Sequence, residues 1–202
     1  MMIHNGEAQR LSDTLSRLDD VGVRALINAA EPIGIGIGGT TKTVCIDKTT
    51  VFVKQLPLTS IEEADATATA SRLQLPFVSH YGIGSPTHAV GRELAAHQVT
   101  TDWVQAGAVD FFPLLLGWRV VDLKGHADLS EFDGDASPRQ WGPYWPQIQS
   151  KLAAMKDASK SMVFFLEYLP ETLGDWVRSS VATGTGATVF RDVVDQLLEA
   201  TA

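Results

Sequence analysis

The 202-residue sequence has a single cysteine, Cys45, and its basic residues never form a block. One cysteine cannot form an internal disulfide, and Cys45 falls in a predicted buried strand, so we expect the cytoplasm as the compartment. Lys and Arg number 16 against 24 Asp and Glu, which gives a net charge of −8. Because this charge repels nucleic acid and anionic lipid, neither is an expected partner.

The sequence also lacks a hydrophobic run of membrane-spanning length. Its longest strongly apolar run, Phe111–Trp118, contains Pro113 and Gly117 and is far shorter than the roughly 18 residues that a membrane helix needs. The first ten residues do not have the basic and then apolar pattern of a signal peptide. With 45% hydrophobic residues, the composition is globular and allows one large domain or two small lobes.

The sequence does contain a glycine cluster followed by two strand-like segments. Gly34, Gly36 and Gly39 match the spacing G-x-G-x-x-G, and Gly38 lies inside it. The β-branched run that follows predicts a second strand, and the next apolar segment predicts a third strand that carries Lys54 inward. We therefore expect two strands that meet at a glycine-rich turn, followed by a third.

Three kinds of phosphate site use such a glycine turn. A dinucleotide-binding turn opens a helix, but Thr40–Val44 is a poor helix start. A Walker-type loop needs lysine and then Ser or Thr directly after its last glycine, and here Thr40 and Thr41 follow Gly39. A protein-kinase hairpin places its lysine on the third strand, as Lys54 is placed here. The remaining alternative is a simple tight turn with a solvated lysine.

Glu93 is the acidic residue expected to pair with Lys54. In the kinase arrangement, a glutamate on the helix after the third strand holds the lysine ammonium on the phosphates of ATP. Glu62 and Glu63 are rivals for this pairing. The alternative for Glu93 is a surface charge that pairs with His97, four residues further along a helix.

A second kinase-like segment follows later in the chain. Residues Ser161–Leu169 predict a buried strand that stops at Pro170, and its part Phe164–Leu169 ends in an acidic, aromatic and apolar triplet. Together with the glycine hairpin, the strand lysine and the helix glutamate, this order resembles a bacterial protein-kinase-like family related to the aminoglycoside phosphotransferases. The resemblance covers about Glu31 to Trp176.

The resemblance implies roles for individual residues. Lys54 and Glu93 would be the catalytic residues of this part of the protein. Leu166 would be the gatekeeper, the backbone carbonyl of Glu167 would accept from the adenine amino group, and the backbone N–H of Leu169 would donate to the ring. ATP would lie under the turn formed by Gly34, Gly36, Gly38 and Gly39.

The resemblance also implies the fold and its divisions. It implies an α+β protein-kinase-like N-lobe, with a five-stranded antiparallel sheet, flanking helices and the first helices of an incomplete C-lobe. The expected parts are a helical extension over 1–30, the N-lobe over 31–169 with an excursion over 122–146, and the hinge exit with the start of the C-lobe over 170–202.

Periodicity and capping patterns predict the helices. One helix or a pair, broken near Gly22, is expected before residue 30. Ser60 and Glu63 form a capping-box pattern for a helix over 61–69. Further helices are expected over 87–104, over 146–155, from 171 onward and over 187–202, and a loop is expected over 74–86.

The catalytic loop and the metal-binding Asp of the family have no counterpart in this sequence. Phe190-Arg191-Asp192 imitates His-Arg-Asp, but it lies inside a helical pattern, and Leu197 stands where Asn is required. The sequence has no other catalytic motif and no multi-cysteine metal site. We therefore expect no turnover by this chain alone, and Mg²⁺ only in a full-length protein.

These observations lead to one functional prediction and two alternatives. The chain is predicted to be the ATP-binding part of a phosphotransferase that moves the γ-phosphate of ATP to an unknown protein or small-molecule hydroxyl. The first alternative is a non-catalytic kinase-like interaction module, and the second is an unrelated α+β domain with a glycine turn. An apolar stripe on the C-terminal helix predicts self-association or poor solubility.

Overall fold

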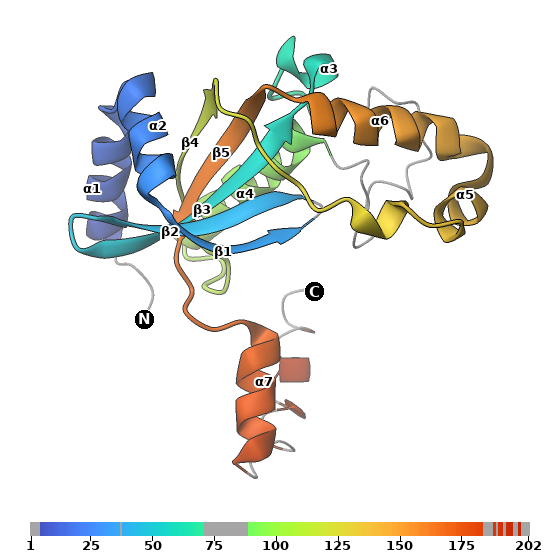
Figure 1. Cartoon of the computed structure of the whole chain (residues 1–202). Helices are drawn as coiled ribbons and strands as arrows, with labels where there is room; N and C mark the ends of the chain where they lie inside the picture. The colour runs from blue at the N-terminus through green and yellow to red at the C-terminus, as the bar shows by residue number, and fades with distance from the viewer. Residues whose placement is uncertain are drawn as a thin grey trace.

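A computed structural model of the chain describes residues 5–36, 38–70 and 89–183, and seven further positions between 188 and 198. It is a mixed helix and sheet structure whose five strands are all antiparallel (Figure 1), so this part of the predicted fold is confirmed. The strand order is β1-β2-β3-β5-β4. The strands are β1 (Glu31–Gly36), β2 (Gly39–Ile46), β3 (Thr49–Leu58), β4 (Leu115–Val121) and β5 (Lys160–Glu167).

Helices lie on both faces of the sheet and in the connection between β4 and β5 (Figure 1). They are α1 (Asn5–Ser16), α2 (Asp20–Ala29), α3 (Ser60–Glu63), α4 (Val90–Gln105), α5 (Ala136–Trp141), α6 (Trp145–Asp157) and α7 (Leu173–Ala182). Two short 3-10 turns, η2 (Ser130–Phe132) and η3 (Gly142–Tyr144), precede and follow α5.

The break between the first two helices, predicted near Gly22, lies a few residues before that glycine. It lies before α2, because Asp19 has an extended backbone and its side chain accepts a hydrogen bond of 2.8 Å from the Gly22 N–H. An Asp in this role caps a helix N-terminus. Gly22 therefore lies in the first turn of α2 and does not end a helix.

The capping box at α3 is also one residue earlier than predicted, and the helix is shorter. Thr59 is the N-cap and Glu62 is its partner, in place of Ser60 and Glu63. The helix ends at Glu63 rather than near residue 69, and turns follow. The threonines and Asp in that segment favour such turns over a helix interior. The predicted loop over 74–86 lies outside the described residues.

Alternate residues of β3 enter two different hydrophobic cores, as the two-residue period of a strand requires. Val51 and Val53 pack with α1 and α2 on one face of the sheet. Phe52, Leu56 and Leu58 pack on the opposite face with apolar residues of α4. Lys54 therefore lies between two apolar neighbours on the α4 face.

The connection between β4 and β5 is more ordered than the polar excursion expected over 122–146. It contains η2, α5 and η3, and it runs on into α6. Leu129 and Phe132 pack against Ile148, Leu152 and Met155 of α6 in a third small core. A few apolar residues within the polar run are thus sufficient to fold it onto the next helix.

Cys45 lies in β2 as predicted, but it is exposed rather than buried. It pairs in register with Thr50, which is also exposed and lies next to the β2–β3 turn. Among the described residues, no helix has the length and apolar character needed to cross a membrane.

Helix α7 follows the last strand through a short extended segment and stands apart from the sheet (Figure 1). It begins at Leu173, two residues after the predicted start, because the Thr172 side chain accepts a hydrogen bond of 3.1 Å from the Asp175 N–H. Most of the helix predicted over 187–202 lies outside the described residues.

Candidate functional site

A row of paired residues crosses all five strands through Lys54. Gly34 pairs with Thr41, Thr41 with Lys54, Lys54 with Phe164, and Phe164 with Trp118. Residues paired across neighbouring strands project from the same face of a sheet. The row therefore places a glycine, a hydroxyl and an ammonium together on the α4 face, next to two large aromatic rings.

The turn between β1 and β2 requires glycine at one position and lies close to Lys54 at another. Gly39 has a φ of +126°, and a Cβ there would lie 2.2 Å from the carbonyl oxygen of Gln55. A Cβ on Gly38 would lie 3.5 Å from Lys54 Nζ, whereas a Cβ on Gly36 would meet nothing within 4 Å. The turn thus brings bare backbone to the lysine ammonium and leaves open space at its β1 side.

Lys54 Nζ forms an ion pair with the carboxylate of Glu93, so the predicted contact between these residues is present. The Lys54 side chain is 27% exposed and that of Glu93 is 12% exposed. A pair shielded to this degree is less screened by salt than a surface pair, and loss of either partner leaves a costly charge. The lysine is therefore held in a defined position on the sheet.

His97 is a second neighbour of the Glu93 carboxylate. Its Nε2 lies 3.8 Å from Glu93 Oε1, and its ring packs edge-on against Phe164, with 5.5 Å between ring centroids. The contact of Glu93 with His97 thus exists together with the Lys54 pair, but Glu93 is not the surface charge of that alternative, because its side chain is only 12% exposed. His97 is largely covered and contributes one wall beside the carboxylate.

The two rival carboxylates pair with other lysines. Glu63 lies 3.2 Å from Lys160 Nζ, and Glu62 lies 2.6 Å from Lys151 Nζ. Burial raises the pKa of Glu62, but the Lys151 ammonium and hydrogen bonds from Thr59 and Val90 outweigh burial and hold that pKa below its usual value. Among the three candidates, the structure places Glu93 against Lys54.

The first turn of α4 brings Glu93 to the sheet because its backbone is packed tightly. A Cβ on Gly91 would lie 2.5 Å from the Ala68 carbonyl oxygen and 2.6 Å from the carbonyl carbon of Thr67. Arg92 donates two side-chain hydrogen bonds, of 2.9 and 3.2 Å, to the Thr69 carbonyl. Glu93 was predicted as a candidate, but these supporting residues were not.

The predicted hinge residues lie at the end of β5 and just beyond it. Leu166 is buried on the α4 face and pairs in register with Phe52, whereas Leu169 is exposed. Glu167 is buried, and its carboxylate accepts a hydrogen bond of 3.3 Å from the Leu114 N–H. Its own N–H donates to the Leu114 carbonyl at 2.8 Å. This side-chain function of Glu167 was not predicted, because nothing near it in sequence indicates the partner.

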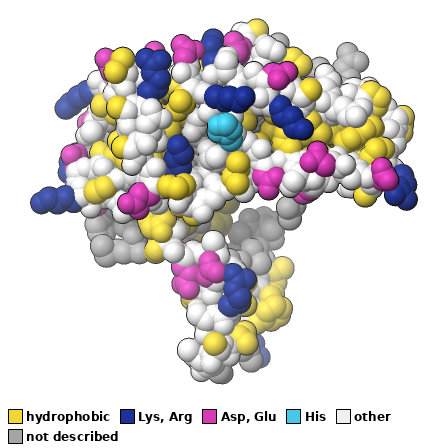
Figure 2. All heavy atoms as spheres, viewed as in Figure 1, with side chains coloured by type: hydrophobic (Ala, Val, Ile, Leu, Met, Phe, Trp, Pro, Cys, Tyr) yellow, Lys and Arg dark blue, Asp and Glu magenta, His cyan; other side chains and the backbone are white. Residues whose placement is uncertain are grey.

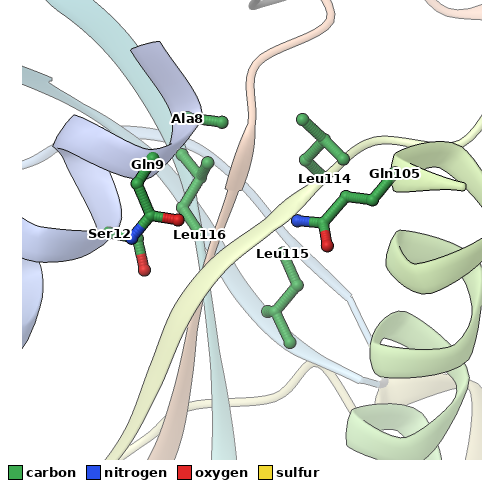
Figure 3. A pocket seen from close by; sticks show the side chains of 7 residues that line it. All are labelled: Ala8, Gln9, Ser12, Gln105, Leu114, Leu115 and Leu116. Atoms are coloured by element: carbon green, nitrogen blue, oxygen red, sulfur yellow. The ribbon is translucent and has the colours of Figure 1, made fainter. Parts of the chain in front are cut away.

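A cavity of about 300 Å³ lies at the start of β4, between α1 and the end of α4 (Figure 3). Leucines of β4 and the segment before it line it together with uncharged polar side chains of α1 and α4. Its lining residues are Ala8, Gln9, Ser12, Gln105, Leu114, Leu115 and Leu116. Because these include no cation, the cavity does not suit a phosphate group.

No family model matches the chain, and no curated protein matches it either. The kinase-like roles of the site residues therefore stay predictions.

The remaining predicted features of the sequence add no second site. Asp192 and Leu197 of the rejected His-Arg-Asp imitation lie outside the described residues. Within residues 5–36, 38–70 and 89–183, no group of three or more His, Cys, Asp or Glu side chains is placed to hold a metal ion. On the face shown in Figure 2, described acidic and basic side chains are interspersed and neither sign gathers into a patch.

Proposed function

We propose that this chain is the ATP-binding part of a protein-kinase-like phosphotransferase that acts in the cytoplasm. The observation that carries the proposal is the Lys54–Glu93 ion pair beneath the glycine turn. A glycine hairpin, a lysine on the third strand and a glutamate on the following helix are the parts with which protein kinases hold the phosphates of ATP. The glycine turn and Lys54 belong to the sheet, and Glu93 reaches the lysine from α4.

The residues around Lys54 fit a polyphosphate. The ammonium provides the positive charge, and the turn at Gly36 and Gly38 provides backbone that side chains do not obstruct. Glu93 keeps the ammonium from turning toward solvent. The adenine is proposed to lie against Leu166, with backbone contacts between Glu167 and Leu169. ATP would supply the γ-phosphoryl group, and the orienting and magnesium-binding carboxylates would belong to other parts of a full-length protein.

The proposal is tested by ATP binding in the absence of Mg²⁺, measured by calorimetry. Lys54→Ala should weaken ATP binding by about tenfold or more, because hydrogen bonds to charged groups contribute about 1.5–3 kcal/mol. Lys48→Ala is the matched control, since Lys48 is an exposed lysine in the β2–β3 turn of the same sheet. Equal loss in the two variants, or no binding by the parent chain at millimolar ATP, would contradict the proposal.

The second candidate function is a non-catalytic interaction module. Exposed apolar side chains on α7 favour it, since Trp176 and Val181 are 37% and 62% exposed. Apolar surface of this kind marks contact sites when it is contiguous. A chain that binds no ATP but recruits a partner through α7 would favour this candidate.

A further inference from the structure

Helix α4 is capped by a residue that belongs to another element. Its N-cap is Ala89, which has no side-chain acceptor, so the first N–H groups of the helix need partners from elsewhere. The carboxylate of Glu62 accepts a hydrogen bond of 3.3 Å from the N–H of Val90, the first residue of α4. A negative charge at this end also complements the helix dipole.

Glu62 is itself held in place from two further directions. Lys151 of α6 lies 2.6 Å from its Oε1, and both side chains are nearly buried, at 7% and 11% exposure for Lys151 and Glu62. The N–H and hydroxyl of Thr59 donate to its Oε2 at 3.2 and 2.5 Å. Removal of one partner from such a buried pair leaves an uncompensated charge, so the arrangement strongly resists displacement.

Val90 and Glu93 share the first turn of α4, so a shift of one moves the other. Because Gly91 packs directly on the backbone of Ala66–Ala68, this turn has no free space on that side. We propose that Glu62 and Lys151 are positioning residues for the nucleotide site, which hold the first turn of α4 and thereby keep the Glu93 carboxylate against Lys54 Nζ. An effect of these residues on ATP binding rests on the proposed function. Their effect on the Lys54–Glu93 ion pair does not.

A second contact supports a link between the β4–β5 connection and this site. The N–H of Asp128 donates a hydrogen bond of 2.9 Å to the carbonyl of Gly36, at the end of β1. Lys151 lies in the last helix of the same connection. The connection thus contacts the glycine turn directly and the glutamate helix through Glu62.

The test measures how fast Lys54 is acetylated by acetic anhydride without nucleotide, with Lys48 as the internal reference and mass spectrometry as the readout. A paired ammonium is protected, so Lys151→Met should speed acetylation of Lys54 by at least about twofold, the lower end of coupling between contacting residues. Lys156→Met is the matched control, because Lys156 is an exposed lysine of the same helix. It should leave the rate unchanged.

Two further variants separate positioning from simple loss of fold. Lys151→Arg keeps the positive charge and should restore protection of Lys54. In a Glu93→Gln background, Lys151→Met should change the acetylation rate no further, because the proposed route passes through Glu93. Additive rates in that background, or unchanged Lys54 protection in a Lys151→Met protein that still unfolds cooperatively, would overturn the inference.

The same assay keeps this inference distinct from the proposed function. Protection of Lys54 by added ATP in the parent chain reports on nucleotide binding alone. If ATP gives no protection while Lys151→Met still speeds acetylation, the positioning role stands and the nucleotide proposal fails. If ATP protects and Lys151→Met has no effect, the nucleotide proposal stands and the positioning role fails.

Discussion

Gly36 and Gly39 pair across the β1–β2 turn, but the backbone conformation requires glycine at only one of these two positions. Gly39 combines a φ of +126° with a Cβ position that overlaps the backbone of Gln55, and Gly36 has neither property. Gly39→Ala should therefore lower the free energy of unfolding by at least about 1–3 kcal/mol, the usual range for such strain.

Gly36→Ala is the control for this prediction and should change stability by less than about 0.5 kcal/mol, as most substitutions with no clash do. Urea denaturation followed by circular dichroism measures both variants. A similar loss of unfolding free energy in the two variants would contradict the prediction, because the backbone of Gly39 would then impose no special requirement for glycine.

Glu62 should make the protein acid-sensitive. Its pKa in the folded protein is below the ordinary value of 4.5, so folding favours the charged carboxylate. The resulting stabilisation is fully present above the unfolded pKa and is lost as the pH falls through the lower folded pKa.

Glu62→Gln removes this contribution and leaves Lys151 unpaired, so it should lower stability at pH 7 by up to about 3–5 kcal/mol. Its remaining stability should fall less steeply than that of the parent between pH 5 and the acid range, in denaturation series at stepped pH. A parallel fall in both proteins would show that other carboxylates dominate the acid response.

The site residues that could be predicted from the sequence are those linked by local patterns. Lys54 follows from the glycine hairpin and the strand period, and Glu93 follows from its place on the next long helix. Glu62 and Glu167 were not given their structural functions, because their partners Lys151 and Leu114 lie far away in the sequence. No local pattern indicates which distant groups will meet.

At the scale of elements, close backbone packing determines where α4 lies. Gly91 lies in a helix and touches the backbone of residues 66–68, whereas Gly6 in α1 has nothing within 4 Å of its Cβ position. Gly6→Ala should stabilise the protein by up to about 0.5 kcal/mol, because alanine is the better helix former but Gly6 lies in the first turn of α1.

Gly91→Ala should instead destabilise the protein and also weaken ATP binding, since the added methyl pushes the first turn of α4 away from the sheet. Thermal unfolding and calorimetry measure the two effects. A more stable Gly91→Ala protein with unchanged ATP affinity would contradict this prediction. It would mean that the 66–68 segment moves to accommodate the methyl group without displacing α4.

Periodicity predicted the elements with strong patterns and failed where packing decides. The hairpin, β3, β5 and α4 were found close to their observed positions, although α4 begins three residues late. The helix expected over 61–69 was mostly wrong, because after Glu63 the chain turns to pack against Gly91. The segment 122–146 has more regular structure than predicted. Its order depends on packing against α6, which follows it in the chain.

At the scale of the whole molecule, α7 presents exposed apolar side chains, with Trp176 and Val181 37% and 62% exposed. Trp176→Ser with Val181→Ser should reduce self-association of the chain, measured by sedimentation velocity over a range of concentrations. Val21→Ser is the control, because Val21 is 64% exposed but lies on α2. If the parent, the α7 double variant and Val21→Ser sediment equally, α7 is not the surface through which the chain self-associates.

The register of the sheet also sets the order of events during synthesis. Lys54 pairs on one side with Thr41, only a hairpin away, and on the other side with Phe164 of β5. Such long-range pairing is slow to form compared with local contacts. On a ribosome, β1, β2 and β3 therefore emerge as a hairpin sheet with an open edge, and the lysine gains its final surroundings only after β5 has left the exit tunnel. Any ligand that needs the complete surroundings of Lys54 can therefore act during translation only after β5 (Lys160–Glu167) has been made.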